Sequence, residues 1–325
     1  MSVYKESIDW LKQSIESILQ QTFSDFEFII ICDNPSYVEA IDLLRNYSKN
    51  DYRVNILVNE ENIGLTKSLN KGIRVSKGEY IVRMDADDVS LPKRIEKQVL
   101  FMDKHPEIVA SGTGAFICYE NKEKRAHRYV ENSDLRSMLI FDTPIFHPSA
   151  IFRKEISGEL IQYDERFRYS QDYALWNKLI EKYYKLSNID IPLLKYRVSD
   201  QQISTAKEDE QLVYELKNQI DSLRIMGIEL SGEELTIFQD LTRRVRVYRS
   251  KMEMEKFIEN FMFAIRERND LRYSIIASRM MLIYVNRLSE SHNLITCLVG
   301  YLSLSWKIRY FSIYCLLSLI SKFVR

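Results

Sequence analysis

The stretch Lys77-Gly-Glu-Tyr-Ile-Val-Arg-Met-Asp-Ala-Asp-Asp88 contains the pattern that decides the fold of this 325-residue chain. An apolar run, typical of a buried strand, leads directly into three carboxylates, Asp85, Asp87 and Asp88. Open α/β sheets bind their ligands at the carboxyl ends of strands, and crowded carboxylates are unfavourable unless positive charge offsets them. Carboxylates together with substrate phosphates hold Mg²⁺. The pattern therefore suits a metal-held nucleotide diphosphate, and alone it equally fits a solvated acidic turn before a helix.

Helix and strand patterns alternate on both sides of this stretch, through about residue 205. Short apolar runs predict strands at 26–33, 54–58 and 79–85, and either a strand pair or one long bent strand at 107–119. Periodic apolar residues predict helices at 7–20, 37–47, 65–77 and 92–105. Gly78 suits a left-handed cap at the end of the third helix. The alternation is the signature of an α/β domain.

From about residue 206 onward, helical patterns replace this alternation. They cover 210–226, 233–263 with possible breaks, 271–287, and two apolar runs at 294–306 and 310–320. The sequence therefore predicts an α/β domain over 1–205 and an α-helical C-terminal region over 206–325. Neither apolar run reaches the roughly 18–20 residues of a transmembrane helix, so interfacial helices and helices of a small bundle both remain open.

Charge is divided unevenly along the chain. Residues 1–241 contain 31 Lys or Arg against 40 Asp or Glu, whereas residues 242–325 contain 15 against 6. After Glu290 the charged side chains are all basic, at Lys307, Arg309, Lys322 and Arg325. A basic, apolar tail favours peripheral contact with anionic lipid, with the interface expected at Trp306, Tyr310 and Phe311. The zero net charge of the whole chain argues against a nucleic-acid partner.

The cysteines and the N-terminus indicate the compartment. Cys32, Cys118, Cys297 and Cys315 form no close pair, so neither a disulfide framework nor a zinc site is indicated. The N-terminus shows no basic segment followed by an apolar core, so no signal peptide is visible. The expected location is therefore cytoplasmic, at the inner face of the cell membrane.

Four blocks together resemble the family 2 glycosyltransferases in order and spacing, over roughly residues 3–205. The blocks are SIESILQQTFSDFEF (14–28), IIICD (29–33), NEENIGLTKSLNKGI (59–73) and KGEYIVRMDADDVSLPKRIEKQ (77–98). The resemblance implies a GT-A fold, in which a Rossmann-like nucleotide-binding sheet joins an acceptor-binding half, and usually an inverting mechanism. It also implies Mg²⁺ or Mn²⁺, a nucleoside-diphosphate sugar as donor, and a growing polysaccharide or lipid-linked oligosaccharide as acceptor.

The same resemblance implies roles for residues on the donor side. Asp33 follows the second family strand, where a carboxylate contacts the nucleoside, and Tyr4 falls at the end of the first strand, near the base. Asp87 matches the direct metal ligand, and Asp85 lies nearer the ribose or supports the metal. The segment Tyr196–Ser204 resembles Tyr-Arg-x-His-x-x-Gln-x-Ser, so Arg197 is expected either to face phosphate or to form a surface salt bridge.

The catalytic base is implied by a separate motif. Gln171-Asp-Tyr-Ala-Leu-Trp176 resembles the family's Glu-Asp-Tyr-Asp-Leu-Trp. Inverting transfer needs a base that deprotonates the acceptor hydroxyl, and Asp172 is the candidate. The alternative for Asp172 is the N-cap of a helix. His147, in the block IFHPSAIFR, is expected to be structural or on the acceptor side rather than a metal ligand.

Three departures from the family keep a second function open. Gln171 replaces the family's first carboxylate, Ser199 stands in place of histidine, and the apolar first strand is mostly missing before Tyr4, so a truncated strand is expected. These departures favour a degenerate, non-catalytic partner in a membrane-bound biosynthetic complex. The four intact carboxylates favour the enzyme: Asp33, Asp85, Asp87 and Asp172. Nucleotidyl transfer is less consistent with the sequence, because no Gly-rich basic phosphate loop is visible near the N-terminus.

Overall fold

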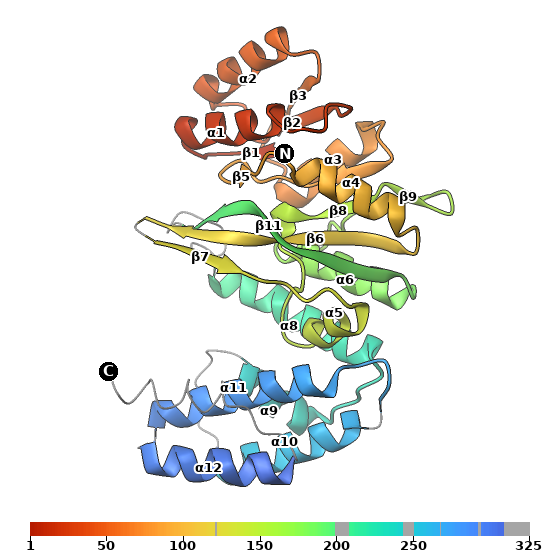
Figure 1. Ribbon diagram of the computed structural model, residues 1–325. Coiled ribbons are helices and arrows are strands. Elements are labelled where there is room, and N and C mark those ends of the chain that lie inside the picture. The colour runs from red at the N-terminus through yellow and green to blue at the C-terminus, as the bar shows by residue number, and fades with distance from the viewer. Residues whose placement is uncertain (121, 199–207, 243–249, 267, 292–293, 309–325) are drawn as a thin grey trace. The chain divides into compact units, whose positions relative to one another are not determined.

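The computed structural model describes residues 1–120, 122–198, 208–242, 250–266, 268–291 and 294–308 (Figure 1). Its internal contacts divide the chain into two units. The first unit comprises residues 1–135 and 142–218, and the second comprises residues 136–141 and 219–325. Helix α8 (Glu208–Ile225), which follows the predicted boundary at 205, begins within the first unit.

A small parallel sheet opens the first unit. Its order is β1 (Ser2–Val3), β2 (Phe28–Cys32) and β3 (Val54–Val58). The helices that alternate with these strands are α1 (Ile8–Leu19), α2 (Val38–Asn50) and α3 (Leu65–Val75). Leu11, Ile30 and Leu44 are fully buried in the core of this part. The predicted strands and helices are present, and β1 is a short strand of two residues.

A second, mixed sheet follows, with the order β4-β8-β6-β11-β5 and with β7 against β6. Its strands are β4 (Tyr80–Val82), β5 (Val89–Ser90), β6 (Ile108–Tyr119), β7 (Lys122–Ala126), β8 (Ile151–Arg153) and β11 (Lys185–Arg197). The central pair, β6 and β11, is parallel, and the other pairs are antiparallel. Around it lie α4 (Arg94–Lys104), α5 (Asn132–Leu139), the 3-10 helix η1 (His147–Ser149), the hairpin β9 (Glu155–Ile156)–β10 (Glu159–Leu160) and α6 (Gln171–Glu181).

The acidic stretch connects the two sheets. The predicted strand 79–85 forms ladder pairs only through Val82, and Asp85 then bridges in parallel to Ser2 of β1. Ser2 itself pairs with Ile31 of β2, so the bridge extends the small sheet toward β4. Residues 83–88 therefore turn away from β4 at the place where the sheets meet.

The second unit is helical, as the sequence predicts for this part of the chain. Its helices are α9 (Gly232–Thr242), α10 (Lys251–Arg266), α11 (Tyr273–Ser291) and α12 (Leu294–Lys307). Ser231 and Glu234 form a capping box, since each donates its backbone N–H to the other's side chain, at 2.9 and 3.3 Å. Phe238, Met280 and Tyr301 are fully buried in the core of the unit.

The apolar run 294–306 forms most of α12, which contributes buried Tyr301 and Leu304 to this core. Among the described helices none is long and apolar enough to cross a membrane. The second apolar run, 310–320, lies outside the described residues together with Tyr310 and Phe311.

The predicted glycine cap of α3 is wrong. The helix ends at Val75, and its cap residue Ser76 has extended backbone, with φ −66° and ψ 150°. Gly78 does not adopt a left-handed conformation. Its N–H instead donates to the Glu27 carboxylate at 3.2 Å, and the Ser76 hydroxyl donates to the Ile73 carbonyl at 2.7 Å. Side chains therefore supply hydrogen bonds at a helix end where a left-handed glycine was expected.

Gly112 of β6 gives a test of packing between the central strands. A Cβ at this position would lie 2.6 Å from Asn188 Oδ1 and 2.6 Å from Ile145 Cγ2. Asn188 cannot easily move, because its amide donates to two backbone carbonyls. We expect Gly112→Ala to lower the free energy of unfolding by about 1–3 kcal/mol, as overpacking does. Urea unfolding followed by tryptophan fluorescence measures this.

Gly78→Ala is the matched control. A Cβ at Gly78 meets its nearest atom at an ordinary 3.4 Å, so its stability should stay close to that of the parent chain. Equal unfolding midpoints for the two variants would contradict the packing described for Gly112.

Candidate functional site

Three carboxylates converge at the turn that joins the sheets. The side chains of Asp85, Asp87 and Asp88 each place an oxygen within 4.8 Å of the others. Asp85 and Asp87 are partly exposed, whereas Asp88 is fully buried. The residues that the sequence assigns to the metal, Asp85 and Asp87, are therefore the two that remain accessible.

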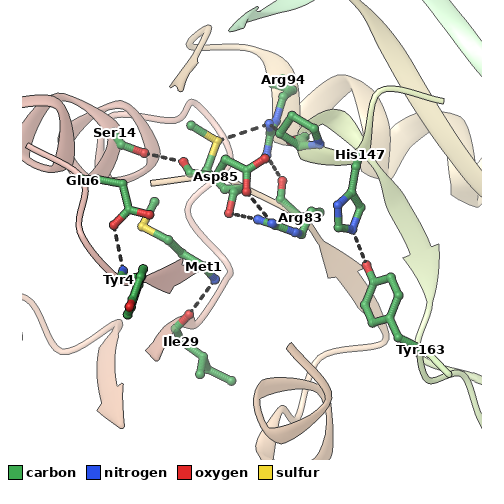
Figure 2. A network of polar contacts seen from close by, with 12 residues as sticks. Met1, Tyr4, Glu6, Ser14, Ile29, Arg83, Asp85, Arg94, His147 and Tyr163 are labelled. Carbon is green, nitrogen blue, oxygen red and sulfur yellow. Dashed lines mark hydrogen bonds and ion pairs between the residues drawn. The ribbon is translucent and has the colours of Figure 1, made fainter. Parts of the chain in front are cut away.

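A buried arginine lies beneath this cluster. The Arg83 guanidinium, 3% exposed, donates to the Asp85 carboxylate and to the Met84 carbonyl (Figure 2). Arg94 of α4 is fully buried and donates to the backbone carbonyls of Arg83 and Pro148, each at 2.8 Å. Burial lowers the pKa of Arg94 to about 10, so it remains charged at neutral pH. Two buried cations thus offset the repulsion between the carboxylates.

Asp88 fastens the acidic turn to the end of β11. Its Oδ1 accepts the backbone N–H of Arg197 at 2.9 Å, while its Oδ2 has no partner within the described part of the chain. Burial, and then the charges of Asp87 and Asp85, raise the pKa of the Asp88 carboxyl well above its usual range. The sequence pointed to Asp88 as part of the cluster but gave it no separate role.

Arg197 also binds the acidic turn through its side chain. The guanidinium donates to the Asp87 carbonyl at 2.7 Å and to the Gln13 side chain, and it lies 5.3 Å from the centre of the Trp10 ring. Contacts from α1 and from the turn thus fix its position. The predicted phosphate contact stays a prediction, and the structure adds a bond from Arg197 to the backbone of the predicted metal ligand.

Asp33 organises the loop that follows β3. Its carboxylate accepts hydrogen bonds from the Asn59 side chain at 2.7 Å and from the backbone N–H groups of Ile63 and Gly64, at 2.9 and 2.8 Å. The Asn59 side chain is itself held by the Lys71 ammonium at 2.8 Å. Asp33 therefore shapes the 59–64 loop, and its contact with the nucleoside stays a prediction.

Tyr4 lies just beyond β1 and is 39% exposed. Its carbonyl accepts from the Asn34 amide at 3.0 Å, and its N–H donates to the Glu6 carboxylate at 2.7 Å. Asn34 directly follows Asp33, so the two residues predicted to bind the nucleoside and base occupy neighbouring strand ends. Their contacts with the nucleoside and the base stay predictions.

Glu6 is a fourth acidic group that the sequence did not reveal. Burial raises the pKa of its carboxyl first, and the charges of Asp87 and Asp85 raise it further. Its carboxylate accepts the N–H group of Tyr4 (Figure 2). It also accepts the N–H group of Lys5. A glutamate before a helix carries no distinguishing sequence signal, so only the three-dimensional arrangement identifies it.

Helix α1 holds the acidic turn from its other side. The buried Ser14 hydroxyl donates to the Asp85 carbonyl at 2.8 Å (Figure 2). The Gln21 amide donates to the Ser90 hydroxyl and the Leu91 carbonyl, at 3.1 and 2.8 Å. Both residues belong to the block 14–28 on which the family resemblance rests, and their part in the fold is to position the turn 85–91.

Asp172 is the second residue of α6 and not its cap. Ser170 occupies the N-cap position, with φ 52°, so the alternative of a capping aspartate is wrong. Burial is the largest cause that raises the pKa of the Asp172 carboxyl to about 6. The backbone N–H groups of Tyr173 and Asp172 oppose the rise, Asp142 adds to it, and Arg83 opposes it to a smaller extent. Arg83 therefore lowers the pKa of the predicted base slightly, in addition to forming an ion pair with Asp85.

His147 forms a hydrogen-bonded pair with Tyr163. The Nε2 atom of His147 lies 2.8 Å from the Tyr163 hydroxyl, and the rings meet edge to face (Figure 2). Burial and the charge of Arg83 lower the pKa of His147 well below its usual range, so its imidazole is neutral at neutral pH. The expectation that His147 has a structural or acceptor-side role stays a prediction.

The donor set of the acidic cluster fits Mg²⁺ or Mn²⁺. Hard divalent cations prefer carboxylate oxygens. The cluster combines two partly exposed carboxylates, Asp85 and Asp87, with a buried Asp88 oxygen that has no partner among the described residues. The residues present therefore suit the metal that the family resemblance implies.

Comparison with known proteins identifies the family. The family model "Glycosyl transferase family 2" matches residues 1–161. An uncharacterized glycosyltransferase of Methanocaldococcus jannaschii, MJ1057, is 35% identical over 218 residues, covering 66% of this chain and 74% of the relative. The amylovoran biosynthesis glycosyltransferase AmsE of Erwinia amylovora is 30% identical over 224 residues, covering 67% and 84%.

Solved structures show the same fold at low identity. TarS of S. aureus, residues 1–349 in complex with UDP-GlcNAc, aligns with TM-score 0.55 and 15% identity, covering 95% of this chain and 91% of that one. The mannosyltransferase PcManGT of Pyrobaculum calidifontis, in complex with GDP-Man and Mn²⁺, aligns with TM-score 0.51 and 14% identity, covering 99% and 82%. These likenesses confirm the GT-A type of fold. Together with the sequence relatives, they confirm the predicted family: the chain belongs to glycosyl transferase family 2 and is a glycosyltransferase.

Proposed function

We propose that this glycosyltransferase moves a sugar from a nucleoside-diphosphate sugar to a saccharide or lipid-linked acceptor in polysaccharide biosynthesis, with a divalent metal and with inversion. The observation that carries the proposal is the cluster of Asp85, Asp87 and Asp88, whose oxygens lie within 4.8 Å of one another, with the buried Arg83 paired to Asp85. The name of AmsE, a biosynthetic glycosyltransferase, supports the class of product. The nucleotide sugars bound to TarS and PcManGT support the class of donor.

On the donor side, each group has a distinct task. Asp87 and Asp85 would hold the metal, which when bound supplies Lewis-acid neutralisation of the charge on the departing diphosphate. Asp33 and Tyr4 bind the nucleoside from the neighbouring ends of β2 and β1. Arg197 directs positive charge toward the diphosphate while its hydrogen bond to the Asp87 carbonyl holds the turn in place. These groups orient the donor before the reaction begins.

On the acceptor side, Asp172 acts as the base. Its carboxylate takes the proton of the acceptor hydroxyl as that oxygen attacks the anomeric carbon. The new carbon–oxygen bond forms on the face opposite the bond to the diphosphate, which breaks and leaves with its electron pair as the nucleoside diphosphate. One displacement of this kind inverts the configuration of the anomeric carbon.

The C-terminal tail is proposed to hold the enzyme at the inner face of the cell membrane. Support comes from the sequence, in which Lys307, Arg309, Lys322 and Arg325 are the charged residues after Glu290. Each basic residue near an anionic surface contributes about 1 kcal/mol to binding. The contact is peripheral, and it leaves the buried side of α12 within its helical unit.

Removal of one carboxylate tests the metal assignment. We expect Asp87→Asn to weaken Mn²⁺-dependent binding of the donor by at least about a hundred-fold, because a ligand contributes no less than the groups that orient it. Isothermal titration calorimetry with UDP, UDP-GlcNAc, GDP and GDP-mannose, with Mn²⁺ and with a chelator, measures the loss and identifies the donor. Asp25→Asn, which changes an exposed carboxylate in the loop after α1, should bind like the parent.

Either of two results would contradict this prediction. Unchanged binding by Asp87→Asn would remove Asp87 from the metal site. If the parent chain binds none of these ligands with Mn²⁺ or Mg²⁺, the alternative of a non-catalytic partner, which Gln171 and Ser199 favour, replaces the proposal.

The pH dependence of the reaction tests the base. Because the pKa of Asp172 is raised to about 6, the active carboxylate form is lost as pH falls through that value. We expect kcat to be level above about pH 7 and to fall about tenfold per pH unit well below 6. A coupled assay of nucleoside diphosphate release over this range, at saturating donor and acceptor, measures the profile.

Asp172→Asn separates this effect from other titrations. It should lower kcat by about 10²–10⁴-fold and leave donor affinity near that of the parent. A flat profile from pH 5 to 8 in the parent, or a variant with nearly normal kcat, would exclude Asp172 as the base.

Neutralisation of the tail tests the membrane contact. We expect the quadruple change of Lys307, Arg309, Lys322 and Arg325 to Gln to reduce binding to phosphatidylserine-containing vesicles by at least about tenfold, since four attractive charges are lost. Vesicle co-sedimentation measures binding, with phosphatidylcholine vesicles as reference. Changing four exposed lysines of the first unit to Gln controls for net charge: Lys12, Lys49, Lys93 and Lys104. Equal loss in both variants would argue against a specific role of the tail.

A further inference from the structure

Two polar groups beside the proposed site have no task in the mechanism. One is the hydroxyl of Tyr196, the second-last residue of β11, directly before Arg197. This hydroxyl forms no hydrogen bond with any residue that the structure describes. The other is Nδ1 of His147, since the imidazole uses Nε2 for Tyr163 and makes no further hydrogen bond within the described ranges. Unpaired polar atoms at a ligand site are the groups that recognise polar ligands.

Tyr196 lies at the acidic turn because its neighbour is bonded to that turn. The Arg197 backbone N–H is 2.9 Å from Asp88 Oδ1, and its guanidinium is 2.7 Å from the Asp87 carbonyl. Side chains of adjacent residues in a strand point to opposite faces, so the Tyr196 ring lies on the face away from the Arg197 guanidinium. There it stacks on Phe146, with ring centres 6.1 Å apart and planes at 28°.

The ring of Tyr196 is fixed by its packing. Besides Phe146, it packs against the core cluster that contains Met84 and Ala86, the residues on either side of Asp85. Phe146 is covered in turn by the Arg128 guanidinium, 3.3 Å from its ring centre. Because apolar contacts hold the ring, its hydroxyl is presented in a defined place without a protein partner.

The Tyr196 phenol lies in partly buried, acidic surroundings. Burial is the largest cause that raises the pKa of Tyr196, and the charges of Asp85, Asp88, Asp87 and Asp172 raise it further. The packing of its ring against the cluster that contains Met84 and Ala86 agrees with this and places Tyr196 beside the acidic turn. Burial likewise raises the pKa of the Tyr163 phenol, which is hydrogen-bonded to His147, and the charges of Asp172 and Asp85 raise it further.

The transferred sugar must occupy the space between these groups. Its anomeric carbon is bonded to the diphosphate at the acidic cluster and is attacked by the acceptor oxygen that Asp172 deprotonates. A polar side chain beside the acidic cluster is therefore placed to contact the sugar that is bonded to the diphosphate. An aromatic ring with a free hydroxyl suits a sugar, which presents apolar C–H faces and hydroxyl groups to its binding site.

We propose that the Tyr196 hydroxyl, together with Nδ1 of His147, binds hydroxyl groups of the transferred sugar and so contributes to the choice of donor sugar. This inference rests on the proposed function and adds to it the groups that recognise the sugar. The phenol can donate and accept, while Nδ1 donates or accepts according to whether Nε2 accepts from or donates to Tyr163. The pair distinguishes a nucleotide sugar from the bare nucleotide.

Tyr196→Phe tests the inference because it removes only the hydroxyl and keeps the stack on Phe146. Calorimetry with Mn²⁺ compares UDP with UDP-GlcNAc and GDP with GDP-mannose. We expect affinity for the nucleotide sugar that the parent prefers to fall about three- to tenfold, the effect of one hydrogen bond, while affinity for the matching bare nucleotide is unchanged. His147→Phe should act in the same direction.

Tyr52→Phe is the matched control, since Tyr52 is 92% exposed and its change should leave both affinities unchanged. Thermal unfolding and the affinity for the bare nucleotide verify that each variant is folded. Equal losses for nucleotide sugar and bare nucleotide, or no loss for either, would overturn the inference. So would unchanged donor binding with a raised KM for the acceptor, because the hydroxyl would then serve the acceptor sugar. If the parent binds neither UDP nor GDP, the proposed function fails and this inference fails with it.

Discussion

The buried guanidinium of Arg83 is the interaction on which the arrangement of the site depends. An ion removed from water carries a penalty of several kcal/mol unless good partners surround it. Here the partners are the Asp85 carboxylate and the Met84 carbonyl, while the backbone of Arg83 is held by Arg94 and by Ala150. Because moving the Arg83 guanidinium away from these partners would leave a buried charge unpaired, the turn that contains Asp85 is held in place. The same charge also lowers the pKa of Asp172 slightly, so one group influences both the metal side and the base side of the site.

The turn is fixed from three further directions, each by a residue distant in sequence. Ser14 of α1 binds the Asp85 carbonyl, Ser2 of β1 bridges to Asp85, and Arg197 of β11 binds the Asp87 carbonyl. All three contacts are made to the backbone of the turn, and only the ion pair of Arg83 with Asp85 uses the side chain of a proposed metal ligand. The backbone is therefore held while the carboxylates of Asp85 and Asp87 stay partly exposed. A preorganised site of this kind loses little free energy to rearrangement when the ligand binds.

The sequence was sufficient for elements with strong periodicity and for residues that belong to a contiguous motif. It predicted the strand 54–58 to the residue, and it brought Asp85 and Asp87 into one cluster. For 107–119 it left a strand pair and one long strand open, and the structure has the single strand β6. It did not reveal Glu6, nor the tasks of Arg83 and Arg94. These residues act across the junction of two sheets, and no local spacing encodes which distant carbonyl a buried arginine reaches. The alternative that Asp172 caps α6 was wrong for a related reason. Ser170 occupies the N-cap position in a left-handed conformation, which its residue type does not suggest.

Gln171, the departure from the family motif that favoured a non-catalytic protein, is adjacent to Asp172 and is compatible with its proposed role as a base. Its side chain is buried at the first position of α6, 5% exposed. A second carboxylate there would place like charge next to a carboxyl that burial already holds at a pKa of about 6, and like charge raises a carboxyl pKa further. The neutral amide adds no such charge. Asp172 therefore remains ionised at neutral pH, the state that a base needs before it receives a proton. The loss of the family's first carboxylate is thus compatible with catalysis, because the backbone N–H groups of Tyr173 and Asp172 and the charge of Arg83 favour the ionised base, and Gln171 adds no further anion to that of Asp142.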